Sequence, residues 1–345
     1  MTIVVTGAAG SVGRRVCERL AGTYSGEILG LDLRDPDPVP AGTEFKMLDL
    51  LTADLSNVFE GAHTLVHLAS ALAPDGTANV DGRIDLAIAR RVLDAAAHVR
   101  QVVLVSTAMV YGAWPDNPMP LTEDAPVRPV PDLGFAVQKA QLERLGLDWR
   151  TDHPRGVLTV LRPAVTVAEA RPGGLARILH SAMTIASEEG DPPAQFLHAD
   201  DLASAVAMVV EQQIDGVLNV APDGWIPAED LVALAGPKPR LRLPGWLARR
   251  FTAARYRLGL APTPPGILPY TTHSWVVSND RLKGLGWSST HSNEEAYVAG
   301  HAPGPLDMLT ARRRQSLALG ATAVVAVGAV AAVVLGIRRL RRPTR

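Results

Sequence analysis

Short apolar runs of five or six residues alternate with longer amphipathic stretches through the first part of the chain. Runs of this length, bounded by turn residues, are typical of buried strands, and the alternation is typical of βαβ units around a parallel sheet. The predicted strands are Thr2–Thr6, Glu27–Asp32, Glu44–Leu48, Thr64–Ala69, Gln101–Ser106 and Val157–Leu161. The pattern therefore predicts an α/β fold with a doubly wound parallel sheet.

Apolar residues at helical spacing predict a helix within residues 79–98. They are Ile84, Ile88, Val92 and Ala95. Between Trp114 and Pro131, six prolines exclude regular structure and predict a long loop, a feature that is usually functional inside a compact domain. After about Ala221 the alternation weakens, which predicts a second, less regular unit.

The carboxyl-terminal region differs from the rest in hydropathy. Leu317–Ile337 is a run of 21 residues without a charge, between arginine clusters. As a helix it would be about 31 Å long, enough for the hydrocarbon core of a bilayer. Buried core helices, the alternative, are seldom this long without a charge. The run is predicted to be a membrane helix, between a basic linker (306–316) and a basic tail (338–345).

Composition and charge exclude several classes of protein. With 345 residues, 47% of them apolar and 20% charged, the chain is neither disordered nor a disulfide scaffold. The single cysteine, Cys17, cannot form an internal disulfide, which fits a reducing compartment. Residues 1–311 contain 26 basic and 35 acidic residues, a net charge of −9, so we expect no nucleic-acid partner.

The location of the chain is predicted from its two ends. Met1 is followed directly by a predicted strand rather than by a signal peptide, so we expect the globular part on the cytoplasmic side of the cytoplasmic membrane. Five arginines after residue 337 oppose translocation of the tail, which leaves its topology open. Gly328, Ala332 and Gly336 would let two membrane helices pack as a homodimer, although an Ala/Val/Gly-rich run contains such spacings by chance.

The turn after the first strand has the glycine pattern of a phosphate-binding loop, Thr6-Gly7-Ala8-Ala9-Gly10-Ser11-Val12-Gly13. Such glycines permit a tight turn and let the backbone approach a pyrophosphate at a helix N-terminus. A glycine turn without a ligand is the alternative, but the strand before it and the helix after it favour a dinucleotide. The predicted contacts are Gly7, Gly10, Ser11, Val12 and Gly13.

Asp32 ends the next predicted strand, 19 residues after Gly13. A carboxylate at this place accepts hydrogen bonds from the adenosine ribose hydroxyls and repels a 2′-phosphate. It therefore favours NAD over NADP as the cofactor. Arg34, two residues further on, is the residue that would instead contact such a phosphate.

Several segments resemble motifs of one enzyme family. The segments are the glycine turn (TGxxGxxG), Asp49-Leu50, His67-Leu68-Ala69-Ser70, Asn79, the Val-Tyr-Gly segment 106–112, and residues 196–203 and 275–287. Together they resemble the extended short-chain dehydrogenase/reductase family, in its epimerase/dehydratase-like branch, over most of residues 1–300. The resemblance implies that Asp49 and Leu50 lie at the adenine, that Leu68 and Ala69 line the cofactor site, and that Thr107 takes the catalytic Ser/Thr position.

The same resemblance implies a domain organisation. A Rossmann-type dinucleotide-binding domain is expected from residues 1–165, with 196–222 returning to it. A smaller substrate-side domain is expected from 166–195 and 223–305. A carboxyl-terminal membrane helix completes the expected architecture.

One departure from the family concerns the active centre, which is Tyr-x-x-x-Lys followed four residues later by an acid. Phe135, Lys139 and Glu143 stand at these places, and Lys139 is one of only four lysines in the chain. The resemblance implies that Lys139 holds the nicotinamide ribose, that Thr107 orients the substrate oxygen and that Phe135 packs where a proton donor would sit. General acid–base catalysis typically contributes about 10²–10⁴-fold to the rate, and a phenyl ring cannot supply it.

Three interpretations of Phe135 stay open. Another proton donor is used (Thr107, Tyr111 or a substrate group), or the protein binds its cofactor with little turnover, or the chemistry needs hydride transfer but no tyrosine. The leading hypothesis is a membrane-tethered, atypical NAD-dependent oxidoreductase or epimerase. The alternative is a non-catalytic NAD(P)-binding sensor or membrane scaffold.

Further departures concern the substrate. Ala108-Met109 stands where dehydratases carry an acidic pair, and Ala194 stands where nucleotide-sugar epimerases place an arginine. Dehydration and a nucleotide-sugar substrate are therefore disfavoured, and tethering suggests a lipid-linked small molecule. Glu123 and Asp124 lie in a loop that borders the nicotinamide pocket in the family, so a direct role is one hypothesis.

The arginine-rich stretch and the histidines are the remaining candidates for binding sites. The arginine-rich stretch 239–260 is interpreted as a surface helix, a membrane-binding face or a clamp for an anionic substrate. No histidine or cysteine has metal-ligand spacing, so no metal is predicted.

Overall fold

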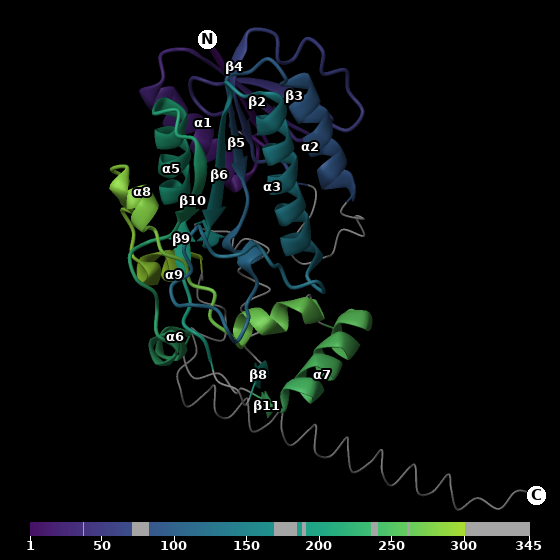
Figure 1. The fold of residues 1–345 in the computed structure, drawn as a ribbon, viewed down its shortest axis with the longest axis vertical. Coiled ribbons are helices and arrows are strands. Elements are labelled where there is room, and N and C mark those ends of the chain that lie inside the picture. The colour runs from purple at the N-terminus through teal and green to yellow at the C-terminus, as the bar shows by residue number, and fades with distance from the viewer. Residues whose placement is uncertain are drawn as a thin grey trace, which may run out of the picture. The chain divides into compact units, whose positions relative to one another are not determined.

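The core of the protein is a parallel sheet, seen in the computed structural model (Figure 1). In the described part of the chain seven strands pair in the order β10-β6-β5-β4-β1-β2-β3, all parallel. They are β1 (Thr2–Thr6), β2 (Glu27–Asp32), β3 (Glu44–Met47), β4 (Ala62–His67), β5 (Gln101–Val105), β6 (Val157–Pro163) and β10 (Gly216–Val220). The predicted parallel sheet is confirmed, and each predicted strand is present within two residues of its expected bounds.

The structure describes residues 1–36, 38–70, 83–168, 185–187, 191–235, 241–260 and 263–300. All of them belong to one compact unit, residues 1–300. The predicted membrane helix at 317–337, its basic flanks and Asn79 lie outside the described residues. Within the described ranges, no helix has the length and apolar character needed to cross a bilayer.

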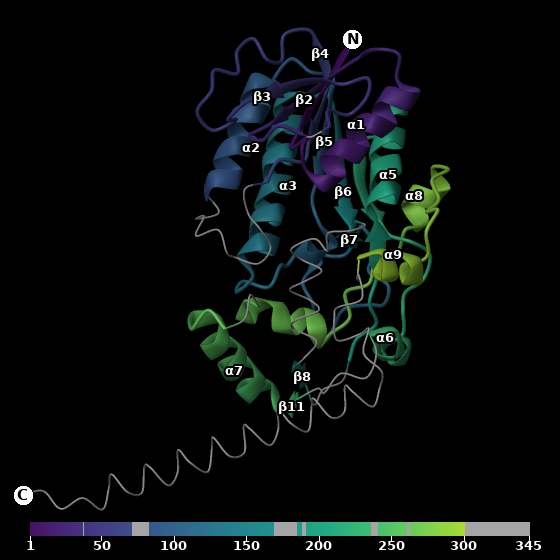
Figure 2. The ribbon, with the colours of Figure 1, turned by 180° about the vertical axis from the view of Figure 1, so that it is seen from behind.

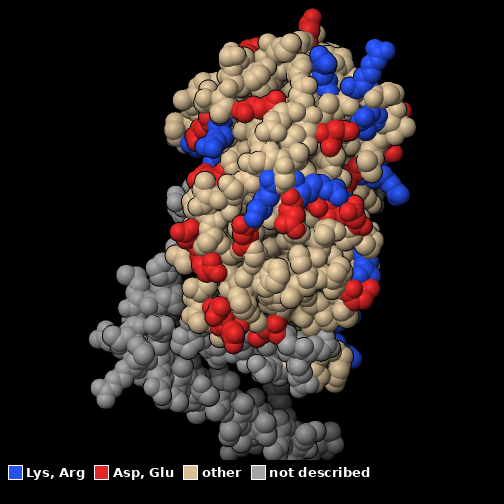
Figure 3. Space-filling model, turned by 60° about the vertical axis from the view of Figure 1, so that its left-hand side comes forward, with Lys and Arg blue, Asp and Glu red and all other residues tan. Residues whose placement is uncertain are grey.

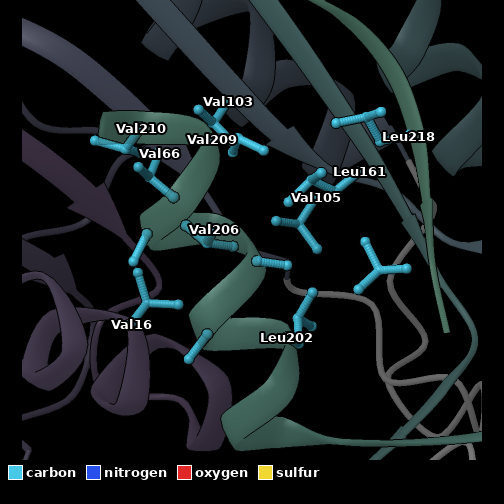
Figure 4. Packing of buried hydrophobic residues seen from close by; sticks show 14 of the residues in the cluster. Val16, Val66, Val103, Val105, Leu161, Leu202, Val206, Val209, Val210 and Leu218 are labelled. Carbon is cyan, nitrogen blue, oxygen red and sulfur yellow. The ribbon is translucent and has the colours of Figure 1, made fainter. Parts of the chain in front are cut away.

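Two pairs of helices cover the two faces of the sheet (Figure 1, Figure 2). α1 (Ser11–Thr23) and α5 (Ala199–Glu211) pack against each other on one face, and α2 (Arg83–Ala95) and α3 (Gly134–Asp152) pack on the other. In Figure 4, Leu202, Val206 and Val209 of α5 point towards valines and leucines of the strands. Helix α2 starts inside the predicted 79–98 segment and carries its apolar face to the sheet, as the spacing predicts.

The chain order of the strands reverses between β1 and β4, so that successive crossovers leave the sheet in opposite directions there. Such a reversal opens a crevice at the carboxyl ends of the strands, which is where ligands bind in open α/β sheets. The loops after β1, β4 and β5 meet at this crevice and contain the predicted site residues.

The remaining elements lie mainly at the carboxyl ends of the parallel strands. They are η1 (Ala108–Tyr111), β7 (Val165–Val167), β8 (Ile185–Ser187), β9 (Phe196–His198), α6 (Ala228–Ala235), β11 (Leu241–Leu243), α7 (Gly245–Arg257), η2 (Pro265–Thr271), α8 (Asp280–Gly284) and α9 (Asn293–Gly300). Figures 1 and 2 both place α6, α7, β8 and β11 beyond that end of the sheet. The division into a cofactor domain and a substrate-side domain stays a prediction.

The proline-rich segment from Trp114 to Pro131 contains no helix or strand, as predicted. It is nevertheless fixed to the rest of the fold. Leu121 forms a parallel bridge with Val277, with backbone hydrogen bonds of 2.8 Å on both sides. The loop is thus packed against the segment that contains Val277 and is fixed in place by backbone hydrogen bonds.

A fully buried carboxylate on α5 fastens the segment before α9 to the sheet's helical layer. Asp201 accepts hydrogen bonds from the backbone and side chain of both Thr290 and His291, at 2.6–3.1 Å. Burial works against the charge, but these hydrogen bonds hold the pKa of Asp201 below its usual value. Its neighbour Asp200 instead forms an exposed ion pair with Arg15. Figure 3 shows such mixed positive and negative side chains gathered in a band across this face.

We predict that Asp201→Ala lowers the free energy of unfolding by about 3 kcal/mol or more, because four donors lose their buried acceptor. The matched change on the next residue, Asp200→Ala, should cost less than about 1 kcal/mol, since its ion pair is solvated. Urea unfolding of the full chain at neutral pH measures both. The lowered pKa means that the Asp201 contribution is complete above about pH 4 and is lost as the pH falls further, so the difference from wild type should shrink there. Equal unfolding midpoints for the two variants at neutral pH would contradict this account.

Candidate active site

The loop between β1 and α1 is held too tightly for side chains at two of its glycines. Gly7 has φ +76°, and a Cβ atom on it would lie 2.8 Å from the backbone nitrogen of Ala69. A Cβ atom on Gly13 would lie 2.1 Å from the carbonyl oxygen of Gly7. The glycines therefore let α1 begin directly against the ends of β1 and β4.

The start of α1 fits a dinucleotide diphosphate. Gly10 is the N-cap residue, and the first turn has neither a side-chain cap nor an acidic residue. The first N–H groups of a helix have no partner within the helix, and the helix dipole adds positive potential at the same point. Ser11 and Val12 carry such N–H groups. Within the described ranges, no side chain of the protein caps these N–H groups in the way an anion would.

Asp32 and Asp49 end the two strands next to the loop. The Asp32 carboxylate accepts hydrogen bonds from the backbone N–H groups of Ala9 (3.0 Å) and Arg34 (3.1 Å), so it is fixed beside the glycine loop with lone pairs left for ribose hydroxyls. The side chain of Arg34 is exposed. Asp49 accepts from the Leu51 N–H (2.9 Å) and the Thr52 hydroxyl (2.8 Å), and these bonds lower its pKa. Leu50 is buried in the core behind it.

The ends of β4 and β5 bring further predicted residues to the crevice. The backbone N–H of Leu68 donates to the Thr6 carbonyl (3.1 Å), and that of Ala69 donates to the Thr6 hydroxyl (3.3 Å). His67 lies 2.8 Å from the same hydroxyl through Nδ1, and burial lowers its pKa to about 3, so the ring is neutral. Thr107 caps η1 by accepting from the Met109 N–H at 3.3 Å, which leaves its hydroxyl proton for another acceptor.

A pocket joins Phe135 and Lys139 to the end of β4. Its lining residues are His67, Ala69, Asp85, Leu86, Phe135, Gln138, Lys139 and Leu142. The structure thus brings together three residues predicted from separate motifs, Ala69, Phe135 and Lys139. Thr107 is not part of this lining and lies at the end of the adjacent strand, β5.

The charged groups of the pocket influence each other. The Lys139 ammonium donates to the Val105 carbonyl at 3.0 Å. Burial lowers the pKa of Lys139, and the carboxylates of Asp85 and Glu143 partly offset this effect. Asp85 accepts a 2.5 Å hydrogen bond from the Ser70 hydroxyl. The pocket therefore contains a lysine whose charge depends on nearby carboxylates.

Asp85 and Gln138 were not predicted as site residues. The Oε1 atom of Gln138 is buried and has no hydrogen-bond partner in the described part of the protein. Asp85 lies in the first turn of α2, next to the apolar face that defined the helix. The helical spacing gave no sign of either role, because only the packing of α2 against α3 turns these side chains to one pocket.

Glu143, the acid that follows Lys139, belongs to a buried network rather than to the pocket. It forms a bidentate ion pair with Arg162 (2.7 Å) and accepts from the Ser106 hydroxyl (2.5 Å). Arg162 also donates to the Tyr111 hydroxyl, which in turn donates to Asn219, each at 2.8 Å. Tyr111 is fully buried, and burial raises its pKa.

This network argues against two of the candidate roles. The Tyr111 hydroxyl is enclosed and already donates its proton within the core, so it is not placed to act as a surrogate proton donor. Glu123 accepts from the Asn219 backbone (2.9 Å), and Asp124 pairs with Arg281 (3.1 Å), so both acids face β10 and α8 instead of the pocket. No cluster of three metal-ligating side chains occurs in the described ranges.

Residues 3–221 match the NAD dependent epimerase/dehydratase family, and the chain belongs to this family. NAD is accordingly its cofactor, and the prediction made from Asp32 and the glycine loop is confirmed. The expected resemblance to the extended short-chain dehydrogenase/reductase family is confirmed at the same level. The glycine loop, Asp32, Lys139 and Thr107 all lie within the matched residues.

The chain is similar in sequence to an uncharacterized protein of Mycobacterium tuberculosis. The two are 28% identical over 311 residues, and the alignment covers 86% of this chain and 82% of that protein. L-arabinose 1-dehydrogenase (NAD(P)(+)) of Haloferax volcanii is 30% identical over 170 residues, 46% of this chain and 65% of that enzyme.

Solved structures show the same fold. UDP-glucose 4-epimerase of Thermus thermophilus in complex with NAD has a TM-score of 0.66 at 20% identity, with 87% of this chain and 97% of the epimerase covered. UDP-glucuronic acid 4-epimerase of Bacillus cereus, in complex with UDP-glucuronic acid and NAD, has a TM-score of 0.65 at 18% identity, with 87% and 98% covered. These similarities confirm the Rossmann-type fold.

We predict that Gly13→Ala weakens NAD binding at least about 10-fold, because its Cβ meets the Gly7 carbonyl and must push α1 away from the loop. Gly22→Ala is the matched control in the same helix, where a Cβ meets nothing within 4 Å. It should leave NAD affinity unchanged and add about 0.5–1 kcal/mol of stability. Calorimetric titration with NAD measures the affinities, and equal weakening in both variants would show that the loop geometry is not the cause.

Proposed function

We propose that the protein is a membrane-tethered NAD-dependent oxidoreductase or epimerase in which Phe135 stands in place of the family's tyrosine. The observation that carries the proposal is the pocket in which Lys139 and Phe135 meet Ala69 at the carboxyl end of the sheet. Lys139 stands at the family's lysine position and lies beside the strand end of the proposed cofactor site. This placement supports a retained catalytic role of Lys139 rather than a purely structural one.

The cofactor-binding residues are assigned as follows in this proposal. N–H groups around Gly7, Gly10, Ser11, Val12 and Gly13 hold the diphosphate. Asp32 accepts from the adenosine ribose, Asp49 and Leu50 lie at the adenine, and Leu68 and Ala69 lie along the nicotinamide half. NAD held by these residues would supply the hydride acceptor for oxidation of a substrate carbon and the hydride donor for the reverse reaction. Lys139 holds the nicotinamide ribose, and Thr107 offers its hydroxyl proton to the substrate oxygen.

The proton of the substrate hydroxyl needs an acceptor, and we propose Asp85. Phe135 has no ionisable group, and Tyr111 is enclosed in the buried network. Burial lowers the pKa of His67 to about 3, which makes its ring a weak base, and its Nδ1 is held by Thr6. Among the described residues that line the pocket, Asp85 is the remaining carboxylate. When the hydroxyl is oxidised, its proton passes to an Asp85 oxygen and its carbon becomes a carbonyl, and the reverse transfer accompanies reduction.

The substrate is proposed to be a hydroxy compound that is lipid-linked or lies close to a membrane. Ala194 supports a substrate other than a nucleotide sugar, because no arginine is present at that position to hold a diphosphate. Leu317–Ile337 supports a tether in the cytoplasmic membrane with the globular unit on the cytoplasmic side. Homodimer formation through this segment would fit its small residues.

The second candidate is a non-catalytic NAD(P)-binding sensor or membrane scaffold. It is favoured by one specific observation, the absence of a phenol from a pocket that otherwise keeps the family's lysine. A sensor needs the cofactor cradle and a response to its redox state, but no proton acceptor at the substrate. The two candidates differ in turnover, not in cofactor binding.

We predict that the purified full chain forms NADH from NAD with at least one compound from a panel of sugars, sterols, polyprenyl-linked alcohols and small hydroxy acids. Phe135→Tyr should raise that rate about 10-fold or more, since it restores a general acid–base group. The measurement is NADH absorbance. If NAD binds but no compound reduces it, and Phe135→Tyr gains only a trace, the sensor replaces the enzyme.

We predict that Asp85→Asn lowers kcat about 100-fold or more while the dissociation constant for NAD changes little, because the amide cannot accept the proton. Asp94→Asn, on the exposed side of the same helix, is the matched control and should keep both values. A variant Asp85→Asn that keeps wild-type kcat, or loses NAD affinity instead, would assign Asp85 to cofactor binding or to stability.

A further inference from the structure

Helix α7 exposes a continuous apolar stripe. Leu247, Phe251, Ala254 and Leu258 follow each other at spacings of four, three and four residues, so they share one side of the helix. The three large side chains are 37%, 41% and 72% exposed. Ala248 and Thr252 are buried and form the packing face of α7, which lies to one side of the stripe.

Positive charge surrounds this stripe. α7 contains no acidic residue, and Arg249, Arg250, Arg255 and Arg257 all lie on it. Arg255 lies over the Phe251 ring at 5.7 Å, and Arg249 forms an exposed ion pair with Asp132 (3.1 Å). Trp246, 65% exposed, precedes the stripe at the amino end of the helix. Residues 1–311 as a whole carry a net charge of −9, so this concentration of arginine is local.

Single exposed apolar side chains are common on soluble proteins, but a contiguous stripe marks a binding surface. Leucine, phenylalanine and tryptophan on one side with arginine beside them is the composition of a helix that lies in a membrane interface. The arginines then meet anionic headgroups while the apolar side chains enter the boundary of the acyl chains.

We propose that α7 docks on an anionic lipid surface, with Leu247, Phe251 and Leu258 inserted and Arg250 and Arg257 among the headgroups. The arginines of α7 complement anionic headgroups, and the apolar stripe between them matches the boundary of the acyl chains, which favours a lipid surface as the occupant. The length of chain after Gly300 also fits, because residues 301–316 span at most about 55 Å before the apolar run Leu317–Ile337 begins. The docking surface itself is independent of that tether.

The docking would also orient the active site. α7 packs on η2, and η2 lies directly against the backbone of Asp132 and Leu133, where a Cβ on Gly266 would be 2.3 Å from Asp132. Asp132 pairs with Arg249 and is three residues before Phe135. Figures 1 and 2 place α7 beyond the carboxyl ends of the strands, the end that contains the pocket. A lipid-bound α7 therefore brings the pocket close to the membrane surface.

The test uses site-specific fluorescence on the full chain. Cys17 is buried, and burial raises its pKa to about 12, so an introduced cysteine is the reactive thiol. Leu247→Cys and Leu258→Cys are labelled with an environment-sensitive dye. Leu147→Cys, 56% exposed on α3, is the matched control. Each protein is reconstituted with phosphatidylcholine vesicles, with and without phosphatidylglycerol, and quenching by doxyl-labelled lipid is measured.

We expect the α7 labels, and not the Leu147→Cys label, to shift to shorter wavelength and to be quenched in anionic vesicles, with the effect weakening at high salt. Arg250→Glu with Arg257→Glu should weaken this docking about 10-fold or more. Equal signals from all three labels, or the same shift and quenching in neutral as in anionic vesicles, would overturn the proposal. A shift that needs only higher protein concentration would assign the stripe to contact between copies.

These outcomes are separable from those of the proposed function. NAD affinity and NADH formation are measured in detergent on the same charge-reversed variant, where both should equal the wild-type values. Flotation of the full chain with neutral vesicles reports on the tail alone. Absence of docking by α7 in the wild-type chain, together with intact NADH formation, would reject the role of α7 and leave the enzyme in place.

Discussion

The unsatisfied N–H groups at the start of α1 are the feature on which the rest of the structure's chemistry depends. They are available because Gly10 caps the helix without a side-chain acceptor and because no acid follows in the first turn. Gly7 and Gly13 bring this helix end against β1 and Ala69, at distances that a Cβ would not permit. In the function proposed above, a dinucleotide held here extends along the ends of β4 and β5, and its reactive half meets the pocket.

Some ionisable side chains are paired inside the core and cannot contact a substrate, whereas others line the pocket. Glu143 and Arg162 form a buried ion pair, and Arg162 also donates a hydrogen bond to Tyr111. These polar groups pair with one another at the junction of α3 and β6, so they do not reach a substrate. A buried pair of this kind is costly to break, because either partner alone would be an uncompensated charge. Lys139 and Asp85 line the pocket instead. The described lining of the pocket has Phe135 in place of a phenol, but it contains a cation, Lys139, and a carboxylate, Asp85.

The end of the sheet beyond these residues joins cofactor, pocket and surface. η2 packs against the segment before α3, and α7 packs on η2. The cofactor loop, the start of α3 and the arginine-rich helix α7 come from distant parts of the chain, yet all lie around the carboxyl ends of the strands (Figure 2). The proposed active site and the proposed lipid-docking helix lie at the same end of the sheet, an arrangement that would suit a substrate held at a membrane.

Local patterns in the sequence were sufficient for the parallel sheet, the glycine loop, Asp32 and the register of Phe135 with Lys139, because strands, helix starts and short motifs depend on neighbouring residues. Tertiary structure alone decided which side chains share the pocket and which are locked away. Asp85 lies 54 residues before Lys139, and Tyr111 bonds to Asn219 across 108 residues. Periodicity identifies the buried face of a helix, but only the packing of α2 against α3, and of α7 on η2, determines what the other faces meet.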